Sequence, residues 1–509
     1  MIRRIGSPLG LGPSSLLLAA AIGAASPPAP ARAADATPAG PTPGQAAALE
    51  AGARAFLAPL LAPLLPPGAA APDLSIVPAG DHYALSLPAS WLTEPNQQVT
   101  ATLRPLDGGR FAVDDIGIPA QGHLAGKVRL PGGEPPGAPE TAGPVRLGYS
   151  IAQQSAHAVI DPTLASPSTF FAALHGVTAD TTTDGFARHD RLDAVSLSFR
   201  LQPTTDGRID AAWTTDLDGM RYDIRLPDAA RPQGAGLAGA VAHQSGTLRL
   251  SHMDRAQAAA LIGAAAALAG APTPDRTARL QALVRSLAGL GATISGEETA
   301  QDVRIDGPAG HVALGALHAT LDGAAPGGAL STRVAAGIDG LAVGGLSPGL
   351  EGILPKHVDL ALSLSGLRAA EVEDLAVAAL APGASTRTLA PRIDALFAPA
   401  GAPASGLPIA GIDALRFDLG PAQVDGHGTL AVRGPQDLRG TARIALSGFD
   451  ALAERLRADP DLAQGAIFLA LARSVARQEG GQMVWDIAVT PEAVTINGVD
   501  PRKLLQSQP

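Results

Sequence analysis

Apolar and polar residues alternate along much of the chain, which is the pattern of β-strands with one buried face. The pattern is clear in HYALSLP, residues 82–88, and in AVSLSFRL, residues 194–201. Turn residues at 107–109 (DGG) and 206–207 (DG) separate such runs and predict hairpins. Because alternation on one face is typical of antiparallel sheets, the chain from Leu74 onward is predicted to begin with antiparallel strands.

In the second half, strand periodicity passes into helical periodicity. In HVDLALSLSGLRAAEVEDLAVAAL, residues 357–380, alternating apolar residues end at a corner and then recur at helical spacing. A strand, a Ser-x-apolar corner and a helix occur together at 251–253, 365–367 and 447–449. We expect the serine to cap each helix and the apolar residue to fasten it to a sheet. The apolar face formed by Val358, Leu360, Leu362 and Leu364 is expected to be partly covered by helices.

The fold class predicted from these patterns is α+β and β-rich, with mainly antiparallel curved sheet and helices concentrated in the second half. The predicted divisions are an export signal (1–33), an Ala/Pro-rich tether and helix (34–72), an N-terminal β-rich region (73–230) and a C-terminal strand–helix region with a closing hairpin (231–509). The helix predicted at residues 45–65 is expected to pack on the body of the protein. A position on a membrane surface is the alternative.

The N-terminus has the features of a cleaved export signal. Arg3 and Arg4 precede an apolar run at residues 16–25, and Ala31-Arg32-Ala33 offers a cleavage site. The predicted location is the periplasm of a Gram-negative bacterium, and an inner-membrane anchor formed by an uncleaved N-terminus is the alternative. The chain has no cysteine, which excludes a lipoprotein anchor, disulfides and thiolate metal sites.

Charge and composition narrow the classes of partner. The formal charge of −10 becomes −13 once Arg3, Arg4 and Arg32 are removed with the signal, and this balance opposes nucleic-acid binding. Aromatic residues make up 3% of the chain, too few for the stacking platforms usual in sugar-cleaving clefts. The oligomeric state is not indicated.

Two short motifs resemble enzyme signatures without the context that their chemistry needs. GLSPG, residues 345–349, has the G-x-S-x-G pattern, but Pro348 follows Ser347 and has no N–H to hold an oxyanion. GAGLAG, residues 234–239, has the G-x-G-x-x-G pattern without a preceding strand and a following helix. Both are interpreted as loops.

Histidines and carboxylates do not form a recognisable site in the sequence. His311 and His318 are seven residues apart, which places them on opposite faces of one strand. His189-Asp190 and Asp425/His427 lack a third ligand, and the carboxylates at 297–298 and 371–374 are interpreted as solvated faces. We therefore predict no catalytic, cofactor-binding or metal-binding residues, and a protein that is not an enzyme.

The C-terminal third resembles a group of uncharacterised alphaproteobacterial periplasmic proteins and is also similar to the C-terminal part of AsmA-like envelope proteins. The resemblance rests on Gly428-Thr429-Leu430, the strand of residues 440–449, the helices flanking Pro460 and the segment Val494 to Gly498. AsmA-like proteins imply a long sheet with an apolar groove and a role in phospholipid movement or envelope homeostasis.

These observations predict a non-enzymatic periplasmic envelope protein that shields or transfers lipid, or supports envelope homeostasis, through an apolar sheet face. Its partner would be phospholipid or another envelope component. The alternatives are a binding or scaffold module for polysaccharide or an envelope protein, and a hydrolase.

Overall fold

The computed structural model describes residues 41–61, 73–89, 92, 96–127, 144–161, 166–183, 186–225, 236–269, 275–288, 293–308, 310–325, 328–381, 383–397, 408–434 and 437–500. They belong to two compact units, and each is described by itself. Unit 1 comprises Met1–Gly234 and His252–Leu290, and unit 2 comprises Ala235–Ser251 and Gly291–Pro509. The predicted export signal and its cleavage site lie outside the described residues.

Unit 1 contains an antiparallel sheet. Its strands are β1 (Ser75–Ala79), β2 (His82–Pro88), β3 (Gln98–Pro105), β4 (Phe111–Gly117), β5 (Gln121–Lys127), β6 (Pro144–Asp161), β7 (Ser166–Thr183), β8 (Phe186–Pro203) and β9 (Ile209–Arg225). Strands β1, β2, β3 and β4 pair in sequence order, β4 and β5 lie one after the other along β6, and β6 to β9 continue in sequence order. The hairpins β3–β4, with the short 3₁₀ turn η2 (Asp107–Gly109), and β8–β9 form where the sequence predicts them.

The core of unit 1 lies between this sheet and helix α2 (Pro43–Leu61). Tyr83, Leu85 and Leu87, the alternating residues of β2, are all buried, and Leu49 of α2 packs into the same cluster. The Tyr83 hydroxyl donates to Gln45 Oε1 at 2.7 Å and accepts from Thr42 N at 3.0 Å, so it fixes the start of the helix. The predicted packing of this helix on the body of the protein is confirmed.

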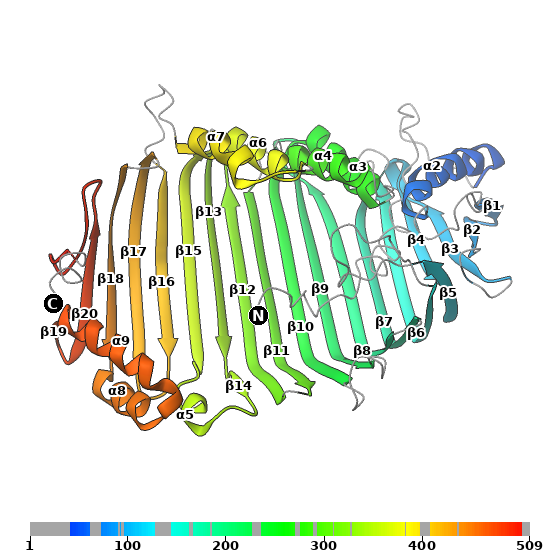
Figure 1. Ribbon diagram of the computed structural model, residues 1–509. Helices are drawn as coiled ribbons and strands as arrows, with labels where there is room; N and C mark the ends of the chain where they lie inside the picture. Colours follow the sequence, from blue (N-terminus) through cyan, green and yellow to red (C-terminus); the bar gives the residue numbers. More distant parts are fainter. Residues whose placement is uncertain are drawn as a thin grey trace. The chain divides into compact units, whose positions relative to one another are not determined.

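The strands of unit 2 are also antiparallel to their neighbours (Figure 1). Its strands are β10 (Gly236–Met253, up to Ser251), β11 (Thr293–Gly307), β12 (Gly310–Ala324), β13 (Ala329–Asp339), β14 (Ala342–Val343), β15 (His357–Arg368), β16 (Ile409–Asp418), β17 (Gln423–Gly434), β18 (Asp437–Ser447), β19 (Arg477–Glu479), β20 (Gln482–Val489) and β21 (Val494–Ile496). The order is β10–β11–β12–β13–β15–β16–β17–β18–β20. The short β14 lies beside β12, and β19 and β21 lie one after the other along β20.

Helices connect strands in both units. They are α3 (Arg255–Ala269) and α4 (Arg276–Ala288) in unit 1, and α5 (Pro348–Glu351), α6 (Ala369–Ala379), α7 (Thr386–Phe397), α8 (Phe449–Ala458), the 3₁₀ turn η6 (Pro460–Leu462) and α9 (Ala463–Ser474) in unit 2. Within unit 2, α6 and α7 lie at one end of the strands, and α5, α8 and α9 at the other (Figure 1). The predicted β-rich α+β class with mainly antiparallel sheet is confirmed.

The distribution of helices is less one-sided than predicted. A concentration in the second half is not clear, because α2 precedes the first strand and unit 1 holds α2, α3 and α4. Residues 252–290, expected in the C-terminal region, belong to unit 1, where α3 contacts α2. None of the helices in the described residues is long and apolar enough to cross a membrane.

The three strand-to-helix corners share a device that differs from the predicted serine caps. The middle residue of each corner has a left-handed backbone: His252 (φ 64°), Gly366 (φ 80°) and Gly448 (φ 69°). No side chain caps α6 or α8, and α3 is instead capped by Asp254, whose Oδ1 accepts from two backbone N–H groups. The serine prediction is wrong, because a left-handed residue turns the chain out of the strand before a serine oxygen reaches the helix N–H groups.

The apolar residue that closes each corner is buried, as the sequence predicts. Met253 is 2% exposed, Leu367 4% and Phe449 6%. Phe449 joins a small core in unit 2 with Leu446, Leu452 and Met483. The corner therefore fastens each helix by its apolar residue while the preceding residue supplies the bend.

Candidate functional site

One face of the unit 2 sheet is apolar, and it is the face that the alternation in β15 predicts. Directly opposed residues in neighbouring antiparallel strands point to the same side of a sheet. Val358, Leu360 and Leu362 are opposed in register by Ile338, Ala336 and Val334 of β13, and by Phe417, Leu415 and Ile412 of β16. We call this surface the apolar face.

The apolar face is open to solvent along its middle row. Val334 is 46% exposed, Leu362 43% and Ile412 38%, and these three residues are opposed to one another across β13, β15 and β16. Helix α8 covers only the corner where Leu446 of β18 and Met483 of β20 lie. Scattered exposed apolar residues are ordinary, but a row in register across three strands is a contiguous apolar surface.

The opposite face of the same strands carries a chain of titratable groups. His357 Nδ1 lies 2.5 Å from Asp339 Oδ1, and His357 Nε2 lies 2.6 Å from Asp359 Oδ2. His318 Nε2 lies 3.5 Å from the other oxygen of Asp359. The hydrogen bond to Asp339, and then the one to Asp359, raise the pKa of His357 above its ordinary value. This series of His and Asp side chains connects the neighbouring strands β12, β13 and β15.

These groups do not form a metal centre. Within the described ranges, no three His, Cys, Asp or Glu side chains are placed to hold a metal ion. The arrangement is better explained as cross-strand ion pairs, which are half exposed and contribute little to stability individually.

A shallow groove of about 860 Å³ crosses β16, β17, β18, β20 and β21. One row along it contains Thr429, Thr441, Ala488 and Thr495, opposed in register. The next row contains His427, Arg443 and Asp486. The groove is therefore lined by hydroxyl groups, paired charged groups and the aliphatic side chains of Ile412, Ala442 and Ile487.

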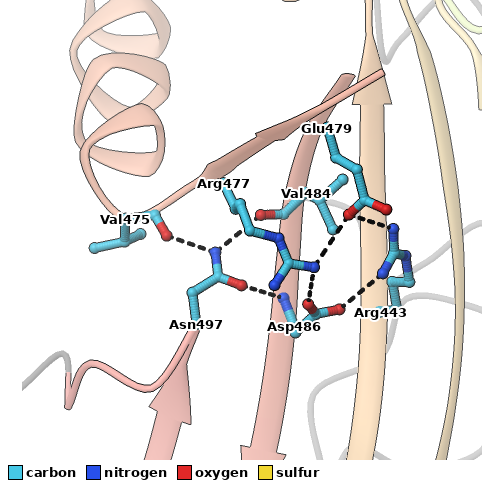
Figure 2. A network of polar contacts seen from close by, with 7 residues as sticks. All are labelled: Arg443, Val475, Arg477, Glu479, Val484, Asp486 and Asn497. Carbon is cyan, nitrogen blue, oxygen red and sulfur yellow. Dashed lines mark hydrogen bonds and ion pairs between the residues drawn. The ribbon is translucent and has the colours of Figure 1, made fainter. Parts of the chain in front are cut away.

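Two arginines and two carboxylates form a network at the end of this groove (Figure 2). Arg443 lies 2.9 Å from Glu479 and 3.4 Å from Asp486, while Arg477 lies 3.1 Å from Glu479 and 2.7 Å from Asp486. Hydrogen bonds from Arg443 and then Arg477 lower the pKa of Glu479. Because each guanidinium faces two carboxylates, the positive charge is balanced and the groove does not favour an anion.

Asn497 lies beside the outer edge of β20, between the part of β20 that pairs with β19 and the part that pairs with β21 (Figure 2). Its Nδ2 donates to Val475 O at 2.7 Å and to Val484 O at 2.9 Å, and its Oδ1 accepts from Asp486 N at 2.9 Å. Its φ of 50° is left-handed. This side chain therefore replaces the backbone hydrogen bonds that neither short strand supplies at this point.

Replacing Asn497 by glycine is expected to destabilise the protein by about 2 kcal/mol. Glycine keeps the left-handed backbone, so the loss reports the three side-chain hydrogen bonds. Chemical denaturation measures the loss, and hydrogen exchange should rise first in β20. Asn96→Gly is the matched control, because Asn96 has φ 62° and an exposed side chain. Equal effects of the two variants would contradict this role of Asn497.

Ser347 and the histidine and carboxylate pairs noted in the sequence lie apart from one another in the structure. Ser347 Oγ donates to Asp459 Oδ2 at 3.2 Å and accepts from Leu350 N at 3.4 Å, so it holds the start of the short α5. His189 contacts Asp180, whereas Asp190 binds Arg188 on the other side of the backbone, and burial raises the pKa of Asp190. His311 lies beside Gly344, apart from His318.

The carboxylate pairs are likewise separate. Glu298 accepts from Gln244 at 2.7 Å, Glu371 pairs with Arg368 at 2.5 Å and Asp374 with Arg392 at 2.8 Å. Asp425 accepts from its neighbour Gln423, while His427 lines the groove.

The loop prediction for residues 234–239 is wrong for its described part. β10 begins at Gly236 and pairs with β11 from Ala238 onward. The partner strand supplies hydrogen bonds that override the low strand preference of a Gly-rich segment.

Sequence reasoning missed the network of Arg443, Arg477, Glu479 and Asp486. The available signal was charged residues at alternate positions near the C-terminus, as in Arg477-Gln478-Glu479, followed by Asp486. Such alternation indicates a polar sheet face but does not show which strands lie side by side.

The chain matches no family model, no curated protein and no solved structure. The resemblance of its C-terminal third to AsmA-like envelope proteins therefore stays a prediction.

Proposed function

We propose that this protein is a non-enzymatic periplasmic envelope protein that binds acyl chains of lipids along the apolar face of unit 2. The observation that carries the proposal is the exposed row of Val334, Leu362 and Ile412, opposed in register across three strands. Covering such a row removes apolar surface from water, which favours an apolar ligand.

The chemistry of the face supports acyl chains over other apolar ligands. The side chains of the apolar face are mostly aliphatic. Because such contacts include no hydrogen-bonding groups, they would discriminate little between acyl chains of different length or saturation. Flat aromatic ligands and sugars are usually held by aromatic side chains, which are 3% of this sequence. The export-signal features and the resemblance to AsmA-like proteins support an envelope location and a role in lipid shielding or movement.

A second candidate is a binding module for polysaccharide, and the groove on the opposite face favours it. The groove has a volume of about 860 Å³ and is lined by the hydroxyls of Thr429, Thr441 and Thr495. Its arginines, Arg443 and Arg477, are already paired with Asp486. A neutral ligand with both hydroxyl and apolar faces, such as a sugar, fits that lining better than a phosphate.

Native mass spectrometry of the full mature protein, purified gently from the periplasm of its host, tests the lipid proposal. We expect adducts whose masses match phospholipids or fatty acids and which disappear after organic extraction. Protein that carries no lipid, and that takes up none from vesicles, would contradict the proposal. An adduct with carbohydrate mass increments would favour the second candidate.

A further inference from the structure

Helix α9 presents an apolar stripe to solvent. Ile467 is 63% exposed, Phe468 72% and Leu471 50%. Their spacing places them within one third of the helix circumference. No other large apolar side chain in the described ranges is as exposed as Phe468.

Contacts on the opposite side of α9 fix the orientation of the helix, so that the apolar stripe faces solvent. Leu469 packs against the small core of unit 2, and Trp485 Nε1 donates to Ala472 O at 2.8 Å. Trp485 is opposed in register to Ile444, so α9 is fastened to the corner of the apolar face. The exposure of Phe468 is therefore a property of a fixed helix.

The charge of α9 and the area of its apolar stripe limit the kinds of partner that could bind there. Helix α9 has no acidic residue, and its single basic residue, Arg473, is engaged with Asp450 at 2.9 Å and over the ring of Phe449. Three side chains offer a few hundred Å² at most, well below the roughly 800 Å² per partner of a stable protein interface. Exposed Phe and Leu side chains on a fixed helix instead suit the boundary between headgroups and acyl chains, where interfacial helices insert such residues.

We infer that α9 is a membrane-contact helix, which seats unit 2 on a lipid bilayer with Phe468 inserted among the acyl chains. The inference rests on the proposed function, since the bilayer would supply or receive the lipid held on the apolar face. Because the stripe is uncharged, attachment is driven by apolar area, and neither anionic lipid nor low salt is required.

Co-sedimentation of the full mature protein with vesicles of phosphatidylcholine, with and without phosphatidylglycerol, tests this inference. We expect similar binding to both vesicles that persists in high salt. Phe468→Ser should lower the partition coefficient by about tenfold or more, since one apolar side chain no longer leaves water. Ala470→Ser, also exposed on α9, is the matched control and should bind like the parent.

Three results would overturn the inference: no binding by the parent protein, binding abolished by salt, or undiminished binding by Phe468→Ser. Light scattering that shows a dimer dissociated by Phe468→Ser would assign the stripe to a second copy instead. Lipid content separates this inference from the proposed function. Phe468→Ser should still carry lipid, so a protein that binds vesicles through α9 but never carries lipid would contradict only the proposed function.

Discussion

Replacing Leu362 by aspartate is expected to abolish lipid binding while leaving the protein folded. Leu362 is 43% exposed, so the new carboxylate keeps much of its water in the unliganded protein. Stability should then change by no more than about 1 kcal/mol, as for surface substitutions. An acyl chain lying on the row would bury that charge without a partner, which should weaken binding by well over tenfold.

The measurement pairs unfolding by urea with the lipid content of the purified variant. Thr441→Asp is the matched control, because it places the same charge at an exposed position on the opposite face of the sheet. Leu362→Met should retain both fold and lipid. An unfolded Leu362→Asp would mean that the face is a covered core, and a folded variant that keeps its lipid would place the ligand elsewhere.

Gly448→Ala is expected to destabilise the protein by about 3 to 4 kcal/mol. The left-handed backbone at φ 69° disfavours any Cβ, and a Cβ at this corner would clash with Pro421 O. Because Pro421 O belongs to the backbone, the clash is relieved only by moving the chain. That movement would withdraw Phe449 and α8 from the small core of unit 2.

Gly480→Ala separates the cost of the left-handed backbone from the cost of the clash with Pro421 O. Gly480 has φ 57°, but a Cβ there would have no heavy atom within 4 Å, so only the backbone preference is lost, at about 1 kcal/mol. Chemical denaturation of the two variants under the same conditions makes the comparison. Equal losses would show that the contact with Pro421 does not restrict the corner.

Local patterns were sufficient to predict several of the strands, hairpins and corners. The alternation in β2, β8 and β15 predicts strands, because side chains on a strand point to opposite faces in turn. The turn residues of the β3–β4 and β8–β9 hairpins predict antiparallel pairing, and the apolar corner residues predict burial at the start of α3 and α8. These inferences hold because they depend on residues within a few positions of one another.

Predictions that depend on how the backbone bends at one residue were less reliable. The Ser-x-apolar pattern predicts each corner but not its left-handed middle residue, and it predicts a serine cap where Asp254 caps α3. The Gly-rich start of β10 predicts a loop, because its pairing with β11 is not visible in its own composition. Tertiary pairing overrides weak local preference in such segments.

The sequence by itself determined that Val358, Leu360, Leu362 and Leu364 share one apolar face, because the strand period is two. Only the tertiary structure decided that the middle of this face is open while α8 covers its corner. It also brought Arg443, Arg477, Glu479 and Asp486 together from three strands and aimed the apolar stripe of α9 outward. The physical reason is that alternation follows from backbone geometry within a strand, whereas burial depends on which distant elements pack against it.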